Sequence, residues 1–321
     1  MPAHPFFSVI IPAYGTAAYI AETLDGVFAQ GEASGQERLE VIVVNDGSPD
    51  TPALELALAP YRERITYLVQ ANAGPSAARN RAIDAAHGTW VALLDSDDVW
   101  LPGYLAAHRR ALAHDPGVAL LFSDGVIEGG PLDGRRLMEV APSHPQVTVE
   151  RLITEACTVL TSCTIVRRDA VLAAGGFPSQ FRRSEDAHLW LRIAMQGGRI
   201  AWHPAPLVRH RRRAGSLADD TPAMVAAYID VLEDLDARLP FTPAQRRLVR
   251  RQIARRRSRV AFEDGRRRFA AGEYAAAAGA LGHAYAWEPA LPAKLKLGLL
   301  RVGVLATPRL LHRAWSWRHG G

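Results

Sequence analysis

Cysteine is nearly absent from this sequence of 321 residues. Its two cysteines, Cys157 and Cys163, are too few for a disulfide scaffold and lack the spacing of a zinc site, so we expect small core side chains in a reducing compartment. There is no run of about 18 apolar residues and no basic segment followed by an apolar core near the start. We therefore expect neither a membrane-spanning helix nor a signal peptide, which favours a cytoplasmic protein.

Lysine is also scarce. The chain has two lysines, Lys294 and Lys296, and both stand near the C-terminus. The formal net charge of +5 hides a strong asymmetry along the chain. Residues 1–200 hold 16 arginines and 23 acidic residues, a net of −7, while residues 201–321 hold 22 basic and 10 acidic residues, a net of +12. The C-terminal part is therefore suited to an anionic partner, which can be a membrane surface, a phosphate-bearing substrate or nucleic acid.

An apolar run that begins at Trp90 ends in three carboxylates, Asp95, Asp97 and Asp98. The run predicts a buried strand, and unpaired acids cannot continue into such a core, so the chain must reach the surface at Asp95. Ligands of open α/β sheets bind just outside the carboxyl ends of the strands. Clustered Asp oxygens at such a place suit Mg²⁺ or Mn²⁺, although an acidic helix N-cap explains the same residues equally well.

Strand and helix patterns alternate along the first two hundred residues. We expect strands at 6–13, 39–44, 65–69, 90–95, 118–122 and 160–167, helices at 17–30, 51–60, 75–86 and 100–113, and a Gly/Pro-rich connection at 124–147. Continuous apolar strands alternating with helices predict a Rossmann-like, mostly parallel sheet that is covered on both faces. The strand ends at Ala13, Asn45 and Asp95 should then lie side by side on one rim of the sheet.

Polar side chains at that rim suit a nucleotide. Asp46 can accept a hydrogen bond from a ring N–H of a base, and Arg79 can pair with a base carbonyl or a phosphate. Each has a simpler explanation, since Asp46 suits a turn and Arg79 a solvated helix face. Their convergence with Asp95 and Asp97 on one end of one sheet favours the nucleotide site.

Five motifs occur in an order and spacing that are specific together. They are SVIIPAY (8–14), VVNDGSPD (43–50), ANAGPSAARNRAI (71–83), LLDSDD (93–98) and the stretch from AAGGFPSQ to RRRAGSLA (173–218). The sequence thus resembles family 2 glycosyltransferases over about residues 6–218. The resemblance implies the GT-A fold, a nucleoside-diphosphate sugar as donor, and an inverting mechanism.

The resemblance also implies roles for individual donor-side residues. Asp46 matches the acid that holds the base, usually uracil, and Arg79 matches a base- or phosphate-contacting arginine. Asp95, Ser96 and Asp97 match the DxD motif, with Asp95 toward the ribose and Asp97 on a Mn²⁺ or Mg²⁺ ion. The remaining nucleotide-sugar contacts are expected from Pro12, Tyr14 and Arg213.

One departure from the family pattern concerns the metal. The family commonly has a histidine three residues before the serine of its closing loop, and here that position, counted back from Ser216, is Arg213. A guanidinium cannot ligate a metal, but it can clamp a diphosphate. His210 is the alternative ligand, although a histidine beside arginines is more often a surface residue. We expect residues 209–213 to form a phosphate-facing loop or a solvated edge.

Asp186 matches the general base that deprotonates the acceptor hydroxyl. Glu185 and Asp186 also suit the first turn of a helix capped by Ser184, and the two interpretations are compatible. One base and one direct displacement predict inversion at the anomeric carbon. On the acceptor side the resemblance implies Phe177, Glu185 and Trp190, although core packing is the simpler explanation for Trp190.

The composition changes after about residue 219, which predicts a catalytic domain at 1–218 and a helical region at 219–321. Helical spacing is found at 222–238 and 243–282, and residues 272–275 (GEYA) resemble the turn of a tetratricopeptide-like hairpin. A tail at 291–317 mixes Leu and Val with basic residues and tryptophans. It suits an amphipathic helix on an anionic bilayer, or equally a surface helix, and the former would place the enzyme peripherally on the inner face of the cell membrane.

The leading interpretation is an enzyme that moves one sugar from a UDP-sugar to a hydroxyl of a glycan or a lipid-linked acceptor. Neither the QxxRW motif nor the spanning helices of processive synthases are found, which favours single transfers. A sugar-nucleotide pyrophosphorylase is disfavoured, because it would need a Gly-rich phosphate loop and a lysine near the start, whereas both lysines of this chain stand near its C-terminus. A nucleic-acid binder using residues 246–259 lacks a recognised module, so nucleic acid is a disfavoured partner. A non-catalytic sugar-nucleotide-binding protein stays open because of the missing histidine.

Overall fold

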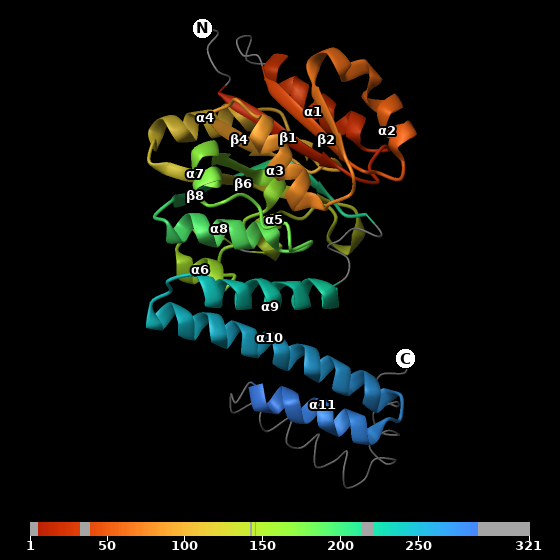
Figure 1. Ribbon diagram of the computed structural model, residues 1–321, viewed down its shortest axis with the longest axis vertical. Coiled ribbons are helices and arrows are strands. Elements are labelled where there is room, and N and C mark those ends of the chain that lie inside the picture. The colour runs from red at the N-terminus through yellow and green to blue at the C-terminus, as the bar shows by residue number, and fades with distance from the viewer. Residues whose placement is uncertain (1–5, 33–38, 142, 145, 214–220, 288–321) are drawn as a thin grey trace. The chain divides into compact units, whose positions relative to one another are not determined.

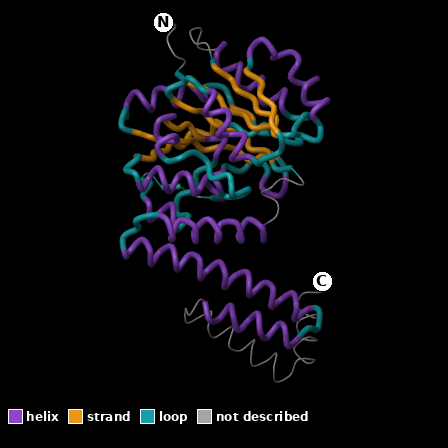
Figure 2. The backbone as a smooth tube through the Cα atoms, viewed as in Figure 1, coloured by secondary structure: helices purple, strands orange, loops and turns teal. Residues whose placement is uncertain are grey.

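The computed structural model describes residues 6–32, 39–141, 143–144, 146–213 and 221–287. The chain divides into two compact units, Met1–Asp220 and Thr221–Gly321, which are described separately (Figure 1). The boundary that we expect at residue 218 and the tail at 291–317 both lie outside the described residues. Figure 2 shows strands and helices in the first unit, while the described residues of the second unit form helices joined by short turns.

A sheet of eight strands forms the frame of the described part of the first unit, in the order β3-β2-β1-β4-β7-β6-β8-β5. The strands are β1 (Phe7–Ala13), β2 (Glu40–Asp46), β3 (Thr66–Gln70), β4 (Trp90–Leu93), β5 (Val99–Trp100), β6 (Val118–Glu128), β7 (Thr164–Arg167) and β8 (Arg199–Arg211). Strands β1 to β4 pair in parallel, β6 pairs in parallel with β8, and β7 is antiparallel to both of its neighbours. The predicted mostly parallel α/β sheet is confirmed.

Helices cover both faces of this sheet. They are α1 (Ile20–Glu32), α2 (Thr51–Leu58), α3 (Pro75–Ala85), α4 (Tyr104–His114), α5 (Leu137–Val140), α6 (Val149–Ile153), α7 (Arg168–Ala173) and α8 (Glu185–Met195), with 3-10 turns at Ala59–Arg64, Gly130–Leu132 and Thr161–Cys163. Val9, Ile10 and Ile11 are all fully buried, as expected for a strand with apolar packing on both sides. Leu24 of α1 joins Val9 and Ile11 in one core cluster, and α3 packs against β1 and β2.

Two segments differ from the sequence-based expectation. Residues 124–128 continue strand β6 instead of opening a connection, because Gly125 lets β8 approach closely: a Cβ there would lie 2.8 Å from the carbonyl oxygen of Val208. Arg209 and Arg211 belong to strand β8 and not to a loop. A strand tolerates them because both guanidinium groups pair with glutamates of neighbouring elements.

The second unit contains α9 (Thr221–Arg238), α10 (Pro243–Ala270) and α11 (Tyr274–Trp287). Helix α10 begins with a capping box, in which Thr242 and Gln245 exchange side-chain and backbone hydrogen bonds. Gly272, with φ of +81°, forms the turn between α10 and α11, and the two helices then run side by side (Figure 1). None of the helices in the described residues is both long and apolar enough to cross a membrane.

Candidate functional site

The carboxyl ends of the parallel strands meet at one rim of the sheet, as expected. Ala13 of β1 is level with Asn45 of β2, whereas Leu93 of β4 is level with Ile10, three residues before the end of β1. The turn at residues 95–98 therefore occupies the space above the short strand β4. This places the acidic turn beside the ends of β1 and β2, where α/β proteins bind ligands.

Asp46 ends strand β2 and is 3% exposed. Its carboxylate accepts hydrogen bonds from Gln70 Nε2 at 2.7 Å and from the backbone N–H groups of Ala73 and Gly74 at 2.9 and 2.8 Å. Gly74 has φ of +90° and leads directly into α3. Asp46 thus fixes the loop before α3, and its contact with a base stays a prediction.

Arg79 of α3 is buried between two carboxylates. Its Nη2 donates to Asp95 at 2.7 Å and its Nη1 donates to Glu185 at 2.6 Å, while its guanidinium lies 5.3 Å from the ring centre of Phe177. Only 6% of the Arg79 side chain is exposed. Arg79 therefore links the acidic turn to the start of α8, and its contact with a base or a phosphate stays a prediction.

Asp186 lies in the first turn of α8 and keeps partial exposure. Its Oδ2 accepts a hydrogen bond from Thr161 Oγ1 at 3.0 Å, and its Oδ1 accepts one from the backbone N–H of Ala187 at 2.7 Å. Desolvation, together with the neighbouring charge of Glu185, raises the pKa of Asp186 to about 6. A carboxylate with this pKa is largely ionised at neutral pH yet basic enough to accept a proton.

Ser184 does not cap helix α8 as expected. Its side chain makes no capping hydrogen bond, and its backbone adopts the left-handed conformation with φ of +57°. The residue instead turns the chain sharply just before Glu185 and Asp186. These two adjacent acids consequently enter different environments, Glu185 the buried pair with Arg79 and Asp186 the partly exposed rim.

The structure does not bring Asp97 and His210 together as a metal-binding pair. The carboxylate of Asp97 pairs with Nε of Arg213, while Nδ1 of His210 lies 3.1 Å from Asp98, which also accepts the backbone N–H of Arg211 at 2.9 Å. Across the described residues, no group of three His, Cys, Asp or Glu side chains is placed to hold a metal ion. The side chains in this turn therefore do not fit the Mn²⁺ or Mg²⁺ that the resemblance implies.

The other expected donor-side residues differ in accessibility. Ser96 is buried, and its hydroxyl pairs with that of Thr16 at 2.9 Å, so its side chain braces the turn. Tyr14 follows β1 and is 51% exposed at the rim, where a ligand can reach it. Pro12 lies within β1 beside Val44 and keeps partial exposure.

The three residues expected on the acceptor side are buried. Phe177 and Trp190 are 1% and 2% exposed and pack edge to face with their ring centres 6.0 Å apart. Glu185 is 7% exposed and is occupied by Arg79. Packing and an internal ion pair thus account for all three, and their place beside the acceptor stays a prediction.

Two site residues are missed by the sequence analysis. Thr161 holds the carboxylate of Asp186, and Ser162 accepts the backbone N–H of Asp95 through its hydroxyl at 3.1 Å. Both stand in a 3-10 turn just before β7, within a segment that we expect to be strand from 160 to 167. The sequence feature that indicates them is a polar Thr-Ser pair inside an otherwise apolar run.

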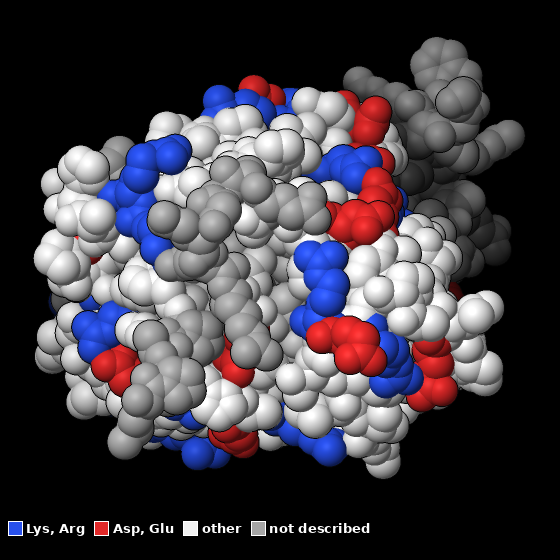
Figure 3. Space-filling view, turned by 90° about the horizontal axis from the view of Figure 1, so that it is seen from above, with Lys and Arg blue, Asp and Glu red and all other residues white. Residues whose placement is uncertain are grey.

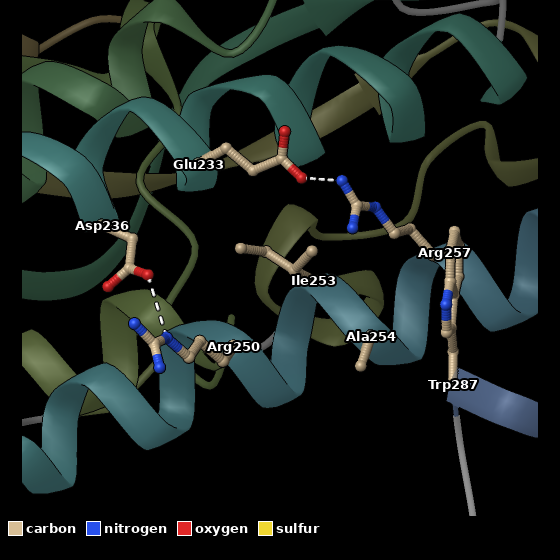
Figure 4. Close-up of a pocket in the computed structure, with 7 residues that line it drawn as sticks. All are labelled: Glu233, Asp236, Arg250, Ile253, Ala254, Arg257 and Trp287. Carbon is tan, nitrogen blue, oxygen red and sulfur yellow. Dashed lines mark hydrogen bonds and ion pairs between the residues drawn. The ribbon is translucent and has the colours of Figure 1, made fainter.

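A separate pocket of about 290 Å³ lies within the second unit (Figure 4). Its lining comes from Glu233, Asp236, Arg250, Ile253, Ala254, Arg257 and Trp287. The charged side chains around it pair with each other, Glu233 with Arg257 and Asp236 with Arg250. These four charges thus compensate one another within the wall of the pocket.

Solved structures with this fold include two that cover nearly the whole chain. Residues 1–349 of S. aureus TarS in complex with UDP-GlcNAc match with a TM-score of 0.62 and 20% identity, over 98% of this chain and 92% of that one. The mannosyltransferase PcManGT from Pyrobaculum calidifontis in complex with GDP-Man and Mn²⁺ matches with a TM-score of 0.60 and 22% identity, over 98% and 84%. The first unit therefore has the GT-A glycosyltransferase fold.

The family model described as Glycosyl transferase family 2 matches residues 8–175. The succinoglycan biosynthesis protein ExoO of Rhizobium meliloti is 31% identical over 241 residues, which are 70% of this chain and 67% of ExoO. An uncharacterized glycosyltransferase of Rickettsia bellii is 28% identical over 187 residues, but the match spans only 26% of that protein. The chain belongs to glycosyl transferase family 2.

Proposed function

We propose that this chain transfers a single sugar from a nucleoside-diphosphate sugar, foremost a UDP-sugar, to a hydroxyl of a glycan or lipid-linked acceptor, with inversion at the anomeric carbon. The observation that carries the proposal is Asp186, a carboxylate with a pKa of about 6 next to the rim of a GT-A sheet. Support for a UDP-sugar comes from the TarS complex with UDP-GlcNAc, and support for a glycan acceptor comes from the name of ExoO.

The proposed reaction is one direct displacement. Asp186 takes the proton of the acceptor hydroxyl while the acceptor oxygen forms a bond to the anomeric carbon on the face opposite the diphosphate. The bond between that carbon and the diphosphate oxygen breaks, and its electron pair leaves with the nucleoside diphosphate. The proton on Asp186 then passes to solvent, which restores the carboxylate for the next cycle.

On the donor side, the exposed residues of the rim are the proposed contacts. The side chain of Asp95 is 35% exposed despite its pair with Arg79, so one edge of the carboxylate can accept a ribose hydroxyl. Tyr14 offers an exposed aromatic face, and Pro12 shapes the end of β1 beside it. Asp46, through the loop that it fixes, sets the surface against which the base would lie. Asp97 and His210, the residues expected to ligate Mn²⁺ or Mg²⁺, are paired with Arg213 and Asp98 instead.

Release of nucleoside diphosphate from a panel of sugar nucleotides tests the proposal, with Asp186→Asn as the variant. We expect donor binding by calorimetry to persist and turnover to fall by about 10²–10⁴-fold, as for loss of a general base. The matched control is Asp84→Asn, an exposed carboxylate on α3. Normal turnover by Asp186→Asn would refute the base assignment, and donor binding without turnover in the unaltered protein would favour a sugar-nucleotide-binding protein.

The proposed acceptor side includes an anionic membrane surface, and an arginine stripe on α10 supports it. Arg247, Arg251, Arg255 and Arg259 are all exposed and recur every four residues, so they share one face of the helix. Other arginines of α10 are used internally, since Arg250 pairs with Asp236. By contrast, the described residues on the face drawn in Figure 3 mix basic and acidic side chains without a large area of one sign.

Like charges at four-residue spacing destabilise a helix by a few tenths of a kcal/mol per pair. In the described part of the chain, no acidic side chain offsets the arginine stripe. Anionic lipid headgroups would do so, and they would hold the enzyme near a lipid-linked acceptor at the inner face of the cell membrane. Nucleic acid carries the same sign of charge and is the alternative partner.

A further inference from the structure

Arg213 places a fixed positive charge inside the acidic turn. Its Nε pairs with Asp97, its Nη1 donates to the carbonyl oxygen of Gly15 at 3.4 Å, and its guanidinium lies 5.7 Å from the ring centre of Tyr19. These contacts join the end of β8 to the segment after β1 and to the turn after β4. The side chain still keeps 26% of its surface exposed. The guanidinium is therefore both held by the protein and accessible from the rim.

The other two carboxylates of the turn also have partners from the protein itself. Asp95 is paired with Arg79, and Asp98 is 1% exposed against His210 and the backbone N–H of Arg211. A divalent ion would have to displace a guanidinium from Asp97, and the described residues would offer it fewer than three His, Cys, Asp or Glu ligands. Metal sites with a single carboxylate leave most of the coordination to water and substrate phosphates.

We propose that Arg213 takes the place of a divalent cation in this enzyme. Held by Asp97, it faces the diphosphate and offsets the negative charge that develops on the departing nucleoside diphosphate, so that transfer proceeds without added metal. The proposal rests on the proposed function and changes its cofactor requirement. A guanidinium suits this task because it carries five N–H donors in a planar fork that matches phosphate oxygens. The contacts with Asp97 and Gly15 use Nε and Nη1, and Nη2 is the nitrogen proposed to donate to a phosphate oxygen.

The test compares nucleoside diphosphate release from a sugar-nucleotide panel in EDTA and in Mn²⁺, with Arg213→Ala, Arg213→His and the neighbouring control Arg212→Ala. The unaltered protein should turn over equally, within about twofold, in both buffers. Arg213→Ala should lose roughly 10²–10³-fold, the usual effect of removing one donor to a developing negative charge. Arg213→His should be inactive in EDTA and regain activity in Mn²⁺, while Arg212→Ala should match the unaltered protein.

Calorimetry with UDP and GDP in EDTA gives a second measurement that does not depend on turnover. We expect the unaltered protein to bind one of them and Arg213→Ala to bind it at least tenfold more weakly. Turnover that vanishes in EDTA and returns with Mn²⁺ in the unaltered protein would overturn the inference and leave the proposed function intact. Failure to bind or turn over any sugar nucleotide in either buffer would overturn both.

Discussion

Glu185 and Asp186 show how two adjacent acids of one helix turn take separate tasks. Glu185 is buried and has the Arg79 guanidinium at 2.6 Å, so its charge is compensated within the protein. Asp186 accepts hydrogen bonds from the hydroxyl of Thr161 and the backbone N–H of Ala187. A carboxylate that lacks a cationic partner keeps its basicity. The environment, and not the residue type, therefore favours Asp186 over Glu185 as the proposed base.

The raised pKa of Asp186 predicts the pH dependence of catalysis. The base works only when ionised, so kcat/KM should increase as the pH rises through about 6 and should level off above it. A pH profile of nucleoside diphosphate release from pH 4.5 to 8.5 measures this, with circular dichroism at each pH as the control for folding. A profile that falls across this range, or one that is flat down to pH 4.5, would contradict the role of Asp186.

Thr161 sets the position of the base and part of its pKa. Its hydrogen bond favours the ionised form of Asp186, so Thr161→Val should raise that pKa further and move the acid limb of the pH profile to higher pH. Thr161→Ser keeps the hydroxyl and should restore the profile. If Thr161→Val lowered the rate equally at every pH, Thr161 would have only a packing role.

At the level of elements, α3 joins the acidic turn after β4 to the start of α8. Arg79 reaches the turn after β4 and the start of α8. The next residue, Asn80, binds both backbone groups of Phe177, donating to its carbonyl at 2.8 Å and accepting its N–H at 2.7 Å. One helix thus fixes the segment that leads to Asp186, and its loss would disturb catalysis without any contact to substrate.

Breaking this connection should destabilise the fold strongly. Arg79→Met leaves Glu185 buried without a counter-charge, and loss of one partner of a buried ion pair typically costs about 3–5 kcal/mol in the free energy of unfolding. The double variant Arg79→Met with Glu185→Gln should recover part of that loss. Urea denaturation measures both, and Arg81→Met, exposed on the same helix, is the control. Equal stability of the single and double variants would argue against the pair.

At the level of the whole molecule, charge is divided between the two units. Residues 1–200 carry a net charge of −7, whereas α10 of the second unit presents the arginine stripe. The charged side chains that line the pocket of the second unit differ from the arginine stripe, because they form ion pairs with one another (Figure 4).

Vesicle binding tests the arginine stripe. We expect co-sedimentation with phosphatidylserine vesicles that weakens roughly fivefold for each stripe arginine changed to Gln, because one basic side chain near such a surface contributes about 1 kcal/mol. Binding should also fall with salt. The control on the same helix is Arg267→Gln, whose charge is already paired with Asp264. Absence of binding by the unaltered protein would refute the membrane proposal, and salt-sensitive binding to an RNA oligomer would favour nucleic acid instead.

The fold and the rim could be predicted from the sequence because both follow from local patterns. Apolar runs ending in Asn45-Asp46 and in Asp95 give buried strands and a polar rim, whichever neighbours they have. Side-chain contacts between residues far apart in sequence leave no such local pattern. Nothing near Arg79 indicates that its charge is used by Glu185, 106 residues away, or that Arg213 lies on Asp97. The sequence does not indicate strand β8, because the glutamates that neutralise its arginines, Glu22 and Glu128, belong to other elements.

The shared guanidinium of Arg79 has a consequence for the order of events. A donor that draws Asp95 away from Arg79 leaves more of that charge to Glu185, which lowers the local negative potential and with it the pKa of Asp186. Linkage makes the effect reciprocal, so ionisation of Asp186 tightens donor binding by the same factor. Below pH 6 the enzyme should therefore hold its donor more weakly, and a filled donor site should prepare the base before the acceptor arrives.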